Sequence, residues 1–243
     1  MISVGFKTDK GVARTDNQDS VFVLPDRNLY MVADGVGGQN SGELASRTAV
    51  GYMAQFAALH PIGQVRPGTE LKAYFSALFA GANELIFRKA GTELIHKGMA
   101  TTAVLCYLRD DKAYVVNVGD SRAYLVRDGN IMQITTDHTL IQEMIDRGEL
   151  TKEQAKDHPD KHVITRAIGG EPIIRPDYYS VDIYPKDTII LCTDGLYGMV
   201  PEEEIAKLAS ASRTMHGLAR SLVDKANLNG GEDNITVVCI RIQ

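Results

Sequence analysis

The 243-residue sequence has no tryptophan and only three cysteines, Cys106, Cys192 and Cys239. Each cysteine lies within an apolar, strand-like run, and no two of them are spaced like a metal-binding or redox pair. The sequence therefore predicts three buried free thiols and argues against cysteine-based metal or redox chemistry.

Basic clusters and long apolar runs are missing as well. The 26 Lys and Arg residues are scattered among 31 Asp and Glu residues, giving a formal net charge of -5 at pH 7. Because nucleic acids and anionic membranes are bound by basic stripes, we expect neither as a partner. Residues 1–11 lack the apolar stretch of a signal peptide, and no run approaches the length of a membrane span. We expect a soluble, cytoplasmic protein.

The remaining composition is that of an ordinary globular protein. Hydrophobic residues make up 44% and charged residues 23% of the chain, and neither repeats nor low-complexity segments interrupt it. A chain of this length with no compositional break is expected to fold as one domain, residues 1–243.

Strand-like runs outnumber helical patterns. Runs rich in Val, Ile, Tyr and Thr predict strands at residues 20–24, 29–33, 101–108, 112–118, 122–126, 178–183, 188–193 and 235–241. Helical periodicity lies between them in pairs, first at 44–56 and 71–85, then after Pro201 and at 215–226. Paired helices do not supply the single crossovers of a parallel sheet, so the order predicts an α+β sandwich of antiparallel sheets with helices outside.

The apolar steps also predict which helix faces are buried. For three of the four helical regions the expected core residues can be named. They are Leu44, Thr48, Tyr52 and Phe56 in 44–56, then Leu71, Phe75, Leu78, Ala82 and Leu85 in 71–85, and Met215, Leu218, Leu222, Val223 and Ala226 in 215–226. Residues 140–177 are polar and poorly periodic, and we expect them to form a loop or flap outside the main layers.

Five aspartates stand beside strand-like runs, and four of the five have a glycine within two residues. They are Asp19, Asp34, Asp120, Asp194 and Asp233. A single Asp-Gly pair is most simply a turn. Several carboxylates converging at one end of a sheet would repel one another unless cations lay between them, and oxygen ligands favour Mg²⁺ or Mn²⁺ over zinc.

Arg14 lies five residues before Asp19 in the stretch GVARTDNQDS. A planar guanidinium beside a cation site is suited to gripping a phosphoryl group through two parallel hydrogen bonds. In isolation such an arginine would be read as a surface residue, and it is the neighbouring carboxylates that favour the phosphate interpretation.

The chain resembles the metal-dependent protein serine/threonine phosphatases of type 2C, the PPM family, in their compact bacterial form. The resemblance is carried in order by RTDNQD (14–19), VADGVGG (32–38), ATTAV (100–104), NVGDSRAYL (117–125), TDHT (136–139), ITRAIG (164–169), LCTDGLYG (191–198) and GGEDNITVV (230–238). Each motif is weak alone, but eight in register over nearly the whole chain are specific.

This resemblance implies an αββα sandwich, two antiparallel sheets flanked by paired helices, with a binuclear metal site at one end. By its match to the family motif, Asp34 would bridge both cations and the carbonyl of Gly35 would bind one of them. Asp194 and Asp233 match the residues that complete the other metal position.

Three further roles follow from the resemblance. Asp19 matches a position that holds metal-bound water, Asp120 matches the ligand of a third, weaker cation, and Arg14 matches the phosphate-binding position. The implied cofactors are two or three Mn²⁺ or Mg²⁺ ions. The implied reaction is attack of a metal-bridged hydroxide on phosphorus, in line with the leaving Ser or Thr oxygen, with Asp34 and Arg14 as catalytic residues.

The sequence departs from the family pattern where relatives place histidine. Val36 stands at the position after Asp-Gly that is histidine in many members, and Gln39 stands where some bacterial relatives have histidine. The proton donor for the leaving group is therefore open, either a bound water or His162 reaching in from the flap. Gln18 replaces a glutamate common in relatives, which weakens an expected water-mediated metal contact.

Two other functions stay open at this level, a catalytically silent phosphoprotein-binding module of the same fold and a hydrolase of small phosphoesters. The first predicts loss of metal carboxylates, and none of the five is missing. For the phosphatase we expect phosphorylated proteins as substrates, a cognate Ser/Thr kinase with opposing activity, and a monomer.

Overall fold

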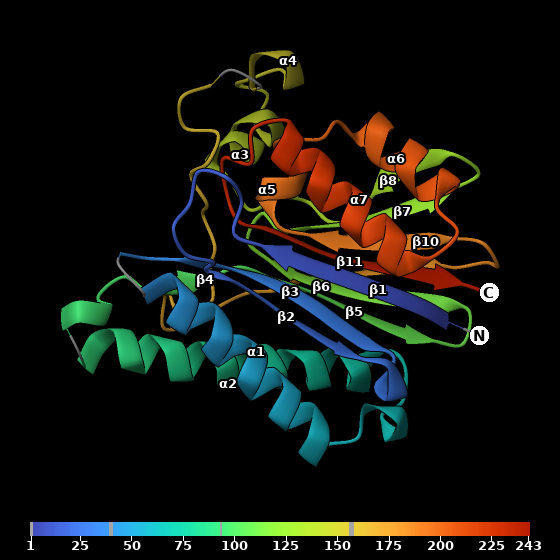
Figure 1. The fold of residues 1–243 in the computed structure, drawn as a ribbon. Coiled ribbons are helices and arrows are strands. Elements are labelled where there is room, and N and C mark those ends of the chain that lie inside the picture. The colour runs from blue at the N-terminus through green and yellow to red at the C-terminus, as the bar shows by residue number, and fades with distance from the viewer. Residues whose placement is uncertain (1, 39–40, 93, 156–157) are drawn as a thin grey trace.

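Two facing β-sheets with helices on both outer surfaces form the molecule (Figure 1). This computed structural model describes residues 2–38, 41–92, 94–155 and 158–243. The layers follow the order helix, sheet, sheet, helix, as the αββα expectation requires.

Every strand pairing between the named strands is antiparallel. One sheet has the order β1 (Ile2–Asp9), β11 (Ile235–Ile242), β10 (Thr188–Cys192), β7 (Arg122–Arg127) and β8 (Asn130–Gln133). The other has the order β2 (Asp19–Leu24), β3 (Leu29–Val36), β5 (Ala103–Arg109), β6 (Lys112–Val118) and β9 (Asp177–Asp182), with β4 (Ala100–Thr101) paired to β3.

The long helices cover the sheets in pairs. The sheet containing β3 is covered by α1 (Ser41–Leu59) and α2 (Thr69–Thr92), and the sheet containing β11 by α6 (Glu202–Ala211) and α7 (Met215–Leu228). Short elements complete the description: α3 (Leu140–Asp146), α4 (Lys152–Ala155), α5 (Asp194–Tyr197) and the 3₁₀ turns η1 (Pro25–Arg27), η2 (Ile62–Gln64) and η3 (Leu94–His96).

Three apolar layers hold these elements together. Tyr30, Val32 and Leu191 belong to the layer between the sheets, and the other two layers lie between each sheet and its helices. The three cysteines are buried and unpaired, as predicted, and burial raises the pKa of each thiol. Their thiols are therefore packing groups rather than nucleophiles.

All eight predicted strands are present, the predicted 101–108 run is divided into β4 and β5, and two further strands were not predicted. The first is β1, whose alternating pattern is interrupted by Gly5. This glycine is needed because a Cβ there would lie 2.1 Å from the backbone nitrogen of His216 in α7. The second is β8, joined to β7 by Asp128 and Gly129, whose φ angles of 50° and 79° are those of a tight hairpin turn. That Asp-Gly pair was the available signal for β8.

The helices begin and end near the predicted residues, but the buried face of α1 was wrong by one position. Ala45, Ala49, Met53 and Ala57, three of them small, are fully buried at steps of four. The expected Leu44, Tyr52 and Phe56 are only partly buried at the edge of the same core. Small side chains let the helix axis approach β3 closely, which the hydropathy of the larger residues concealed. In α2, Ile86 is buried where Leu85 was expected, and Leu85 is 44% exposed. The predicted face of α7 is fully confirmed.

The first part of the 140–177 segment lies beyond the ends of the sheets, where α3 and α4 appear at the top of Figure 1. Its last part returns to the main layers, which corrects the expectation, because Ile168 is buried in the core with α1 and α2 and Asp177 begins β9. The expected loop thus contains two short helices, and two isolated bridges, Thr139 to Ile164 and Thr101 to Ile168, connect it to the main layers. Among the helices formed by the described residues, none combines the length and apolarity needed to span a bilayer.

Candidate active site

A cavity of about 630 Å³ opens at the end of the sandwich below the 140–177 segment. Seven of the eight predicted site residues line it: Arg14, Asp34, Gly35, Asp120, His162, Asp194 and Asp233. The eighth, Asp19, is buried behind the lining with 7% exposure. The structure therefore brings together residues from both sheets and from the segment beyond them.

Asp34 lies inside β3 and not at its end, which corrects the sequence expectation. The strand continues to Val36 because β4 pairs with it, Gly35 opposite Thr101 and Val36 opposite Ala100. The side chain of Asp34 faces the cavity, while its backbone N–H and its carbonyl both form hydrogen bonds with Thr102. Its N–H donates to Thr102 Oγ1 at 2.9 Å, and its carbonyl accepts from Thr102 N–H at 2.8 Å.

Asp19 lies opposite Asp34 across the β2–β3 pairing. The Thr193 hydroxyl donates to Asp19 Oδ2 at 2.9 Å, while Asp19 Oδ1 is buried and has no hydrogen-bond partner among the described residues. Thr193 Oγ1 in turn accepts from the Thr236 N–H at 3.0 Å. A buried carboxylate oxygen without a donor is unfavourable by itself and is suited to a cation or an ordered water.

Asp194 begins α5, directly after β10. Its Oδ1 is also buried, and no residue in the described part of the chain forms a hydrogen bond with it. The glycine that follows it is required by packing, because a Cβ on Gly195 would lie 2.1 Å from the Asn234 carbonyl oxygen. Gly35 is similar, with its Cβ position 2.0 Å from the Gly42 carbonyl oxygen. The two Asp-Gly pairs therefore allow backbone segments to meet behind the carboxylates, an additional reason for glycine beyond access to a cation.

Burial and mutual repulsion govern the charges of these acids. Burial raises the pKa of Asp19 to about 7, with further increases from Asp194 and Asp233. Burial likewise raises the pKa of Asp120 to about 7 and that of Asp34 well above its usual value, with Asp19 and Asp194 adding to the shift at Asp34. Carboxyls whose ionised form is this unfavourable form a site that a bound cation would stabilise.

The pKa of Asp194 is also raised, mainly by burial and then by Asp233. A hydrogen bond with the Asp34 side chain and the positive charge of His162 lower this pKa in part. Asp34 and Asp194 therefore face each other across the cavity floor, with His162 near enough to act on Asp194.

Arg14 lies at the cavity mouth and is not free. Its side chain is 55% exposed, and its Nη2 donates to Asp233 Oδ2 at 2.8 Å. The other oxygen of Asp233 accepts from the Asn234 N–H at 2.8 Å. Asn234 holds the Arg14 loop in place, since its side-chain amide donates to the carbonyls of Lys10 and Asp16. The guanidinium and the carboxylate therefore occupy the mouth as a pair.

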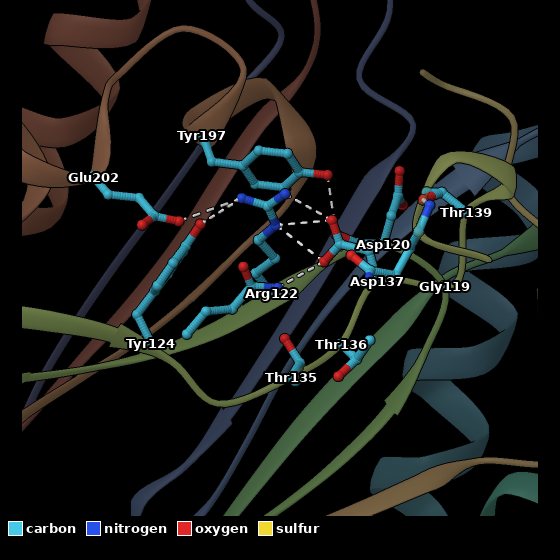
Figure 2. A network of polar contacts seen from close by, with 12 residues as sticks. Gly119, Asp120, Arg122, Tyr124, Thr135, Thr136, Asp137, Thr139, Tyr197 and Glu202 are labelled. Carbon is cyan, nitrogen blue, oxygen red and sulfur yellow. Dashed lines mark hydrogen bonds and ion pairs between the residues drawn. The ribbon is translucent and has the colours of Figure 1, made fainter. Parts of the chain in front are cut away.

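Asp120 follows β6 and its side chain is buried, with 6% exposure. The Tyr197 hydroxyl donates to its backbone carbonyl at 3.0 Å. Burial and the charges of Asp120 and Asp194 raise the pKa of Tyr197, so this hydroxyl keeps its proton. Behind Tyr197, Figure 2 shows the Arg122 guanidinium between the tyrosine ring and Asp137, a network that connects the Asp120 turn to α5.

The positions that depart from the family pattern can now be located. Val36 lines the cavity and is 43% exposed, so it presents a methyl surface where relatives have an imidazole. His162 also lines the cavity and is exposed. A Cβ on Gly42 would lie 2.4 Å from Gln18 Oε1, so the Gln18 amide packs against the start of α1. Gln39 falls outside the described residues.

The donor set fits hard divalent cations that keep much of their water. Among the described residues, no three Asp, Glu, His or Cys side chains converge closely enough to hold an ion by themselves. Mg²⁺ and Mn²⁺ accept such sites, since they bind through one or two carboxylates and complete their coordination with water. The unpartnered oxygens of Asp19 and Asp194 supply the unsatisfied negative groups that such ions require.

Several residues that shape the site were not predicted from sequence. They are Thr102, Thr193, Asn234, Arg122 and Tyr197, each acting on a carboxylate or its backbone. All five lie within the quoted motifs, and for four of them proximity to an aspartate in the sequence was the available signal, whereas Thr102 has no aspartate nearby. Their contacts cross between strands, and sequence spacing alone does not reveal such contacts.

Comparison with known proteins gives a consistent family. The family model described as Protein phosphatase 2C matches residues 11–229. The chain is 36% identical over 238 residues to Serine/threonine phosphatase stp of Listeria innocua, covering 97% of this chain and 94% of that protein.

Solved structures agree with this result. The S. agalactiae serine/threonine phosphatase superposes with a TM-score of 0.92 at 29% identity, covering 100% of both chains. The catalytic domain of serine/threonine protein phosphatase PstP, solved in complex with two manganese ions, superposes with a TM-score of 0.86 at 31% identity, covering 100% of this chain and 99% of that one. With a matching family model, sandwich fold and carboxylate-lined cavity, this chain belongs to the protein phosphatase 2C family and is a metal-dependent protein serine/threonine phosphatase.

Proposed function

We propose that phosphoserine and phosphothreonine are hydrolysed in the carboxylate-lined cavity, with Asp34 at its centre. The observation that supports this most is the facing pair Asp34 and Asp194, two carboxyls whose pKa values are raised and which share one cavity with an unpartnered buried oxygen. Such a pair is stable in its charged form only with cations beside it.

Residues are assigned to the cations by their place in the cavity and by the family match. Asp34 would bridge two ions, with the Gly35 carbonyl on one and Asp194 and Asp233 on the other. Asp120 would hold a third, weaker one, and Asp19, behind the lining, would hold metal-bound water in place. When bound, the cations lower the pKa of coordinated water and offset charge on the phosphoryl oxygens. The PstP structure with two manganese ions supports the binuclear part of this assignment.

Arg14 is proposed to bind the phosphoryl group. Its guanidinium already pairs with a carboxylate at the cavity mouth, so the geometry for gripping two oxygens of an anion is present. A substrate phosphoryl group would replace Asp233 at Arg14 and leave that carboxylate to a cation. His162 lines the same cavity and has no hydrogen bond to its imidazole within the described chain, and we propose it as the contact from the 140–177 segment to the substrate.

Phosphorylated proteins are the proposed substrates, as the names of the relatives indicate for those proteins. We further propose that the chain acts as one domain over residues 1–243, as a monomer, and against a cognate Ser/Thr kinase. The 140–177 segment is the proposed place of substrate selection, because its residues His162 and Ile164 line the cavity and belong to no named strand.

Turnover of a phosphothreonine peptide tests the proposal. We expect hydrolysis with Mn²⁺, none with EDTA, and a higher kcat/KM for the peptide than for a small phosphoester such as p-nitrophenyl phosphate. Equal or better turnover of the small ester would favour a general phosphoesterase, and bound Mn²⁺ without turnover of either substrate would favour a phosphoprotein-binding module.

Arg14→Ala is expected to raise KM for the peptide by about 10-fold to 100-fold, the size of one charge-assisted interaction of about 1.5–3 kcal/mol. Lys10→Ala is the control, since Lys10 is an exposed cation of the same loop that does not line the cavity. Steady-state kinetics on both variants distinguish the two residues. An unchanged KM for Arg14→Ala would contradict the phosphate-binding role.

A further inference from the structure

Arg122 forms a largely buried cluster with Asp137, Tyr124, Tyr197 and, at 3.6 Å, Glu202, on one side of the cavity (Figure 2). Its Nε and Nη2 donate to Asp137 Oδ2 at 3.0 and 2.7 Å, and its Nη1 donates to the Tyr124 hydroxyl at 2.8 Å. Its guanidinium carbon lies 3.6 Å from the centre of the Tyr197 ring. The side chains of Arg122 and Asp137 are only 20% and 11% exposed, so this pair is little screened by water.

Tyr197 connects the cluster to the cavity wall indirectly, because it does not line the cavity itself but contacts Asp120, which does. Tyr197 ends α5, one helical turn after Asp194, and its hydroxyl bonds the Asp120 carbonyl. Arg122 covers the ring face and so fixes the direction of that hydroxyl. A single side chain thus spans the helix that begins with Asp194 and the turn that carries Asp120.

The Asp120 turn has little regular pairing to hold it otherwise. Gly119 has a φ of 102°, and its N–H donates to His138 Nδ1 at 3.1 Å. The His138 N–H donates back to the Gly119 carbonyl at 3.0 Å. His138 is the neighbour of Asp137, so the turn is held from one side by this loop and from the other by Tyr197.

We infer that Arg122 and Tyr197 are positioning residues that set the placement of the Asp120 carboxyl relative to Asp194, and through it the affinity of the cation that Asp120 holds. The inference rests on the proposed function, since it takes Asp120 and Asp194 as cation ligands. Neither side chain touches the substrate in this arrangement. Both act through the backbone that carries the ligands.

The same strand offers a matched control. At the other end of β7, Arg127 donates to Asp187 through Nε at 2.9 Å and through Nη2 at 2.6 Å, and its guanidinium lies 4.6 Å from the Tyr184 ring centre. This second Arg, Asp and Tyr cluster has similar chemistry to the first, but its polar contacts among the described residues go to Asp182 and Asp187, neither of which is a proposed cation ligand. Variants in the Arg127 cluster therefore measure how the loss of such contacts changes stability, without a change at the proposed cation site.

The experiment compares Tyr197→Phe with Tyr184→Phe, and Arg122→Lys with Arg127→Lys, in the full chain. Mn²⁺ binding to metal-free protein is measured directly from the free-ion signal in electron paramagnetic resonance, alongside Tm and peptide kinetics. We expect Tyr197→Phe and Arg122→Lys to weaken the lowest-affinity class of Mn²⁺ sites by about 10-fold, equivalent to one hydrogen bond of about 1.4 kcal/mol. They should lower kcat at limiting Mn²⁺ with KM for the peptide unchanged, and excess Mn²⁺ should restore kcat.

The control variants should keep all Mn²⁺ affinities and kcat, and their loss of Tm should be equal or smaller, because Arg127 and Tyr184 are more exposed than Arg122. Weak-site affinities equal to wild type in Tyr197→Phe and Arg122→Lys would overturn the inference, as would equal losses of affinity in the control pair. Asp194→Asn distinguishes failure of the metal-ligand assignment from failure of the positioning role. If the wild-type protein binds no Mn²⁺ or Asp194→Asn leaves tight binding intact, the metal assignment itself is wrong and the positioning role falls with it.

Discussion

Asp34→Asn should reduce turnover of a phosphothreonine peptide by about 10³-fold or more and at the same time stabilise the metal-free protein. The loss of activity follows from the central position of the carboxyl, which faces Asp194 and would bridge two cations. At 1.36 kcal/mol per decade, a 10³-fold loss corresponds to about 4 kcal/mol of transition-state stabilisation. Loss of one ligand to both cations is large enough to reach that figure, because metals each supply several kcal/mol.

The gain in stability follows from the same burial. Without cations, Asp34 is an acid surrounded by protein whose pKa is raised by burial and by the charges of Asp19, Asp194 and Asp120. Asparagine has nearly the same shape and carries no charge, so the substitution removes repulsion at neutral pH. We expect the free energy of unfolding of the metal-free protein to rise by about 1 kcal/mol or more.

Urea unfolding in EDTA and peptide kinetics in Mn²⁺ measure the two effects on one preparation. Asp128→Asn is the control, because Asp128 is exposed in the β7–β8 turn with a φ of 50° that asparagine also accepts. It should change neither quantity appreciably. A stability loss in Asp34→Asn would indicate that the carboxyl makes favourable contacts in the metal-free protein, and retained activity would remove Asp34 from the catalytic site.

The sequence was sufficient for the site and the layer order because both are encoded locally. A carboxylate beside a glycine and a strand is a short pattern that occurs in four of the eight motifs, and eight short motifs in a fixed order identify a family. The helix boundaries and the predicted strands follow for a similar reason, since periodicity and turn residues are properties of neighbouring residues.

What the sequence could not supply depends on contacts between distant segments. The continuation of β3 beyond Asp34 requires β4, whose two residues are too few to show a strand pattern. The reason for glycine at 195 is a carbonyl 39 positions away at Asn234. Arg122 is recognisable as part of a motif, but its ring contact with Tyr197 and its pairing with Asp137 join three separate parts of the chain.

The buried carboxyls also make a prediction about pH, and its sign follows from their raised pKa values. Asp19 and Asp120 have pKa values of about 7 in the folded protein against 3.8 without the fold. Between these values the folded state binds more protons than the unfolded state, so the free energy of unfolding falls as pH rises. The fall is up to about 1.4 kcal/mol per pH unit for each group and is complete above the folded pKa.

His138 acts in the opposite sense, because burial lowers its pKa and the unfolded state takes up its proton first as pH falls. One histidine opposes at least two carboxyls, so the net sign is set by the acids. Metal-free protein should therefore be more stable at about pH 5.5 than at about pH 7.5 by a few kcal/mol, a reversal of the usual acid sensitivity of proteins.

Bound cations should remove this pH dependence of the free energy of unfolding, and their effect on stability at neutral pH should be larger than the effect of pH itself. They favour the ionised carboxylates, so saturating Mn²⁺ is expected to raise stability most at neutral pH and little at about pH 5.5, where protons compete for the same oxygens. At a free Mn²⁺ concentration about 100 times its Kd, a single site adds about 2.7 kcal/mol. Urea unfolding at both pH values, with EDTA or Mn²⁺, gives the four free energies needed. A metal-free protein that loses stability on acidification would show that these carboxyls are ionised in the folded chain and that protein groups already stabilise their charge. The cavity would then have no excess negative charge that requires cations.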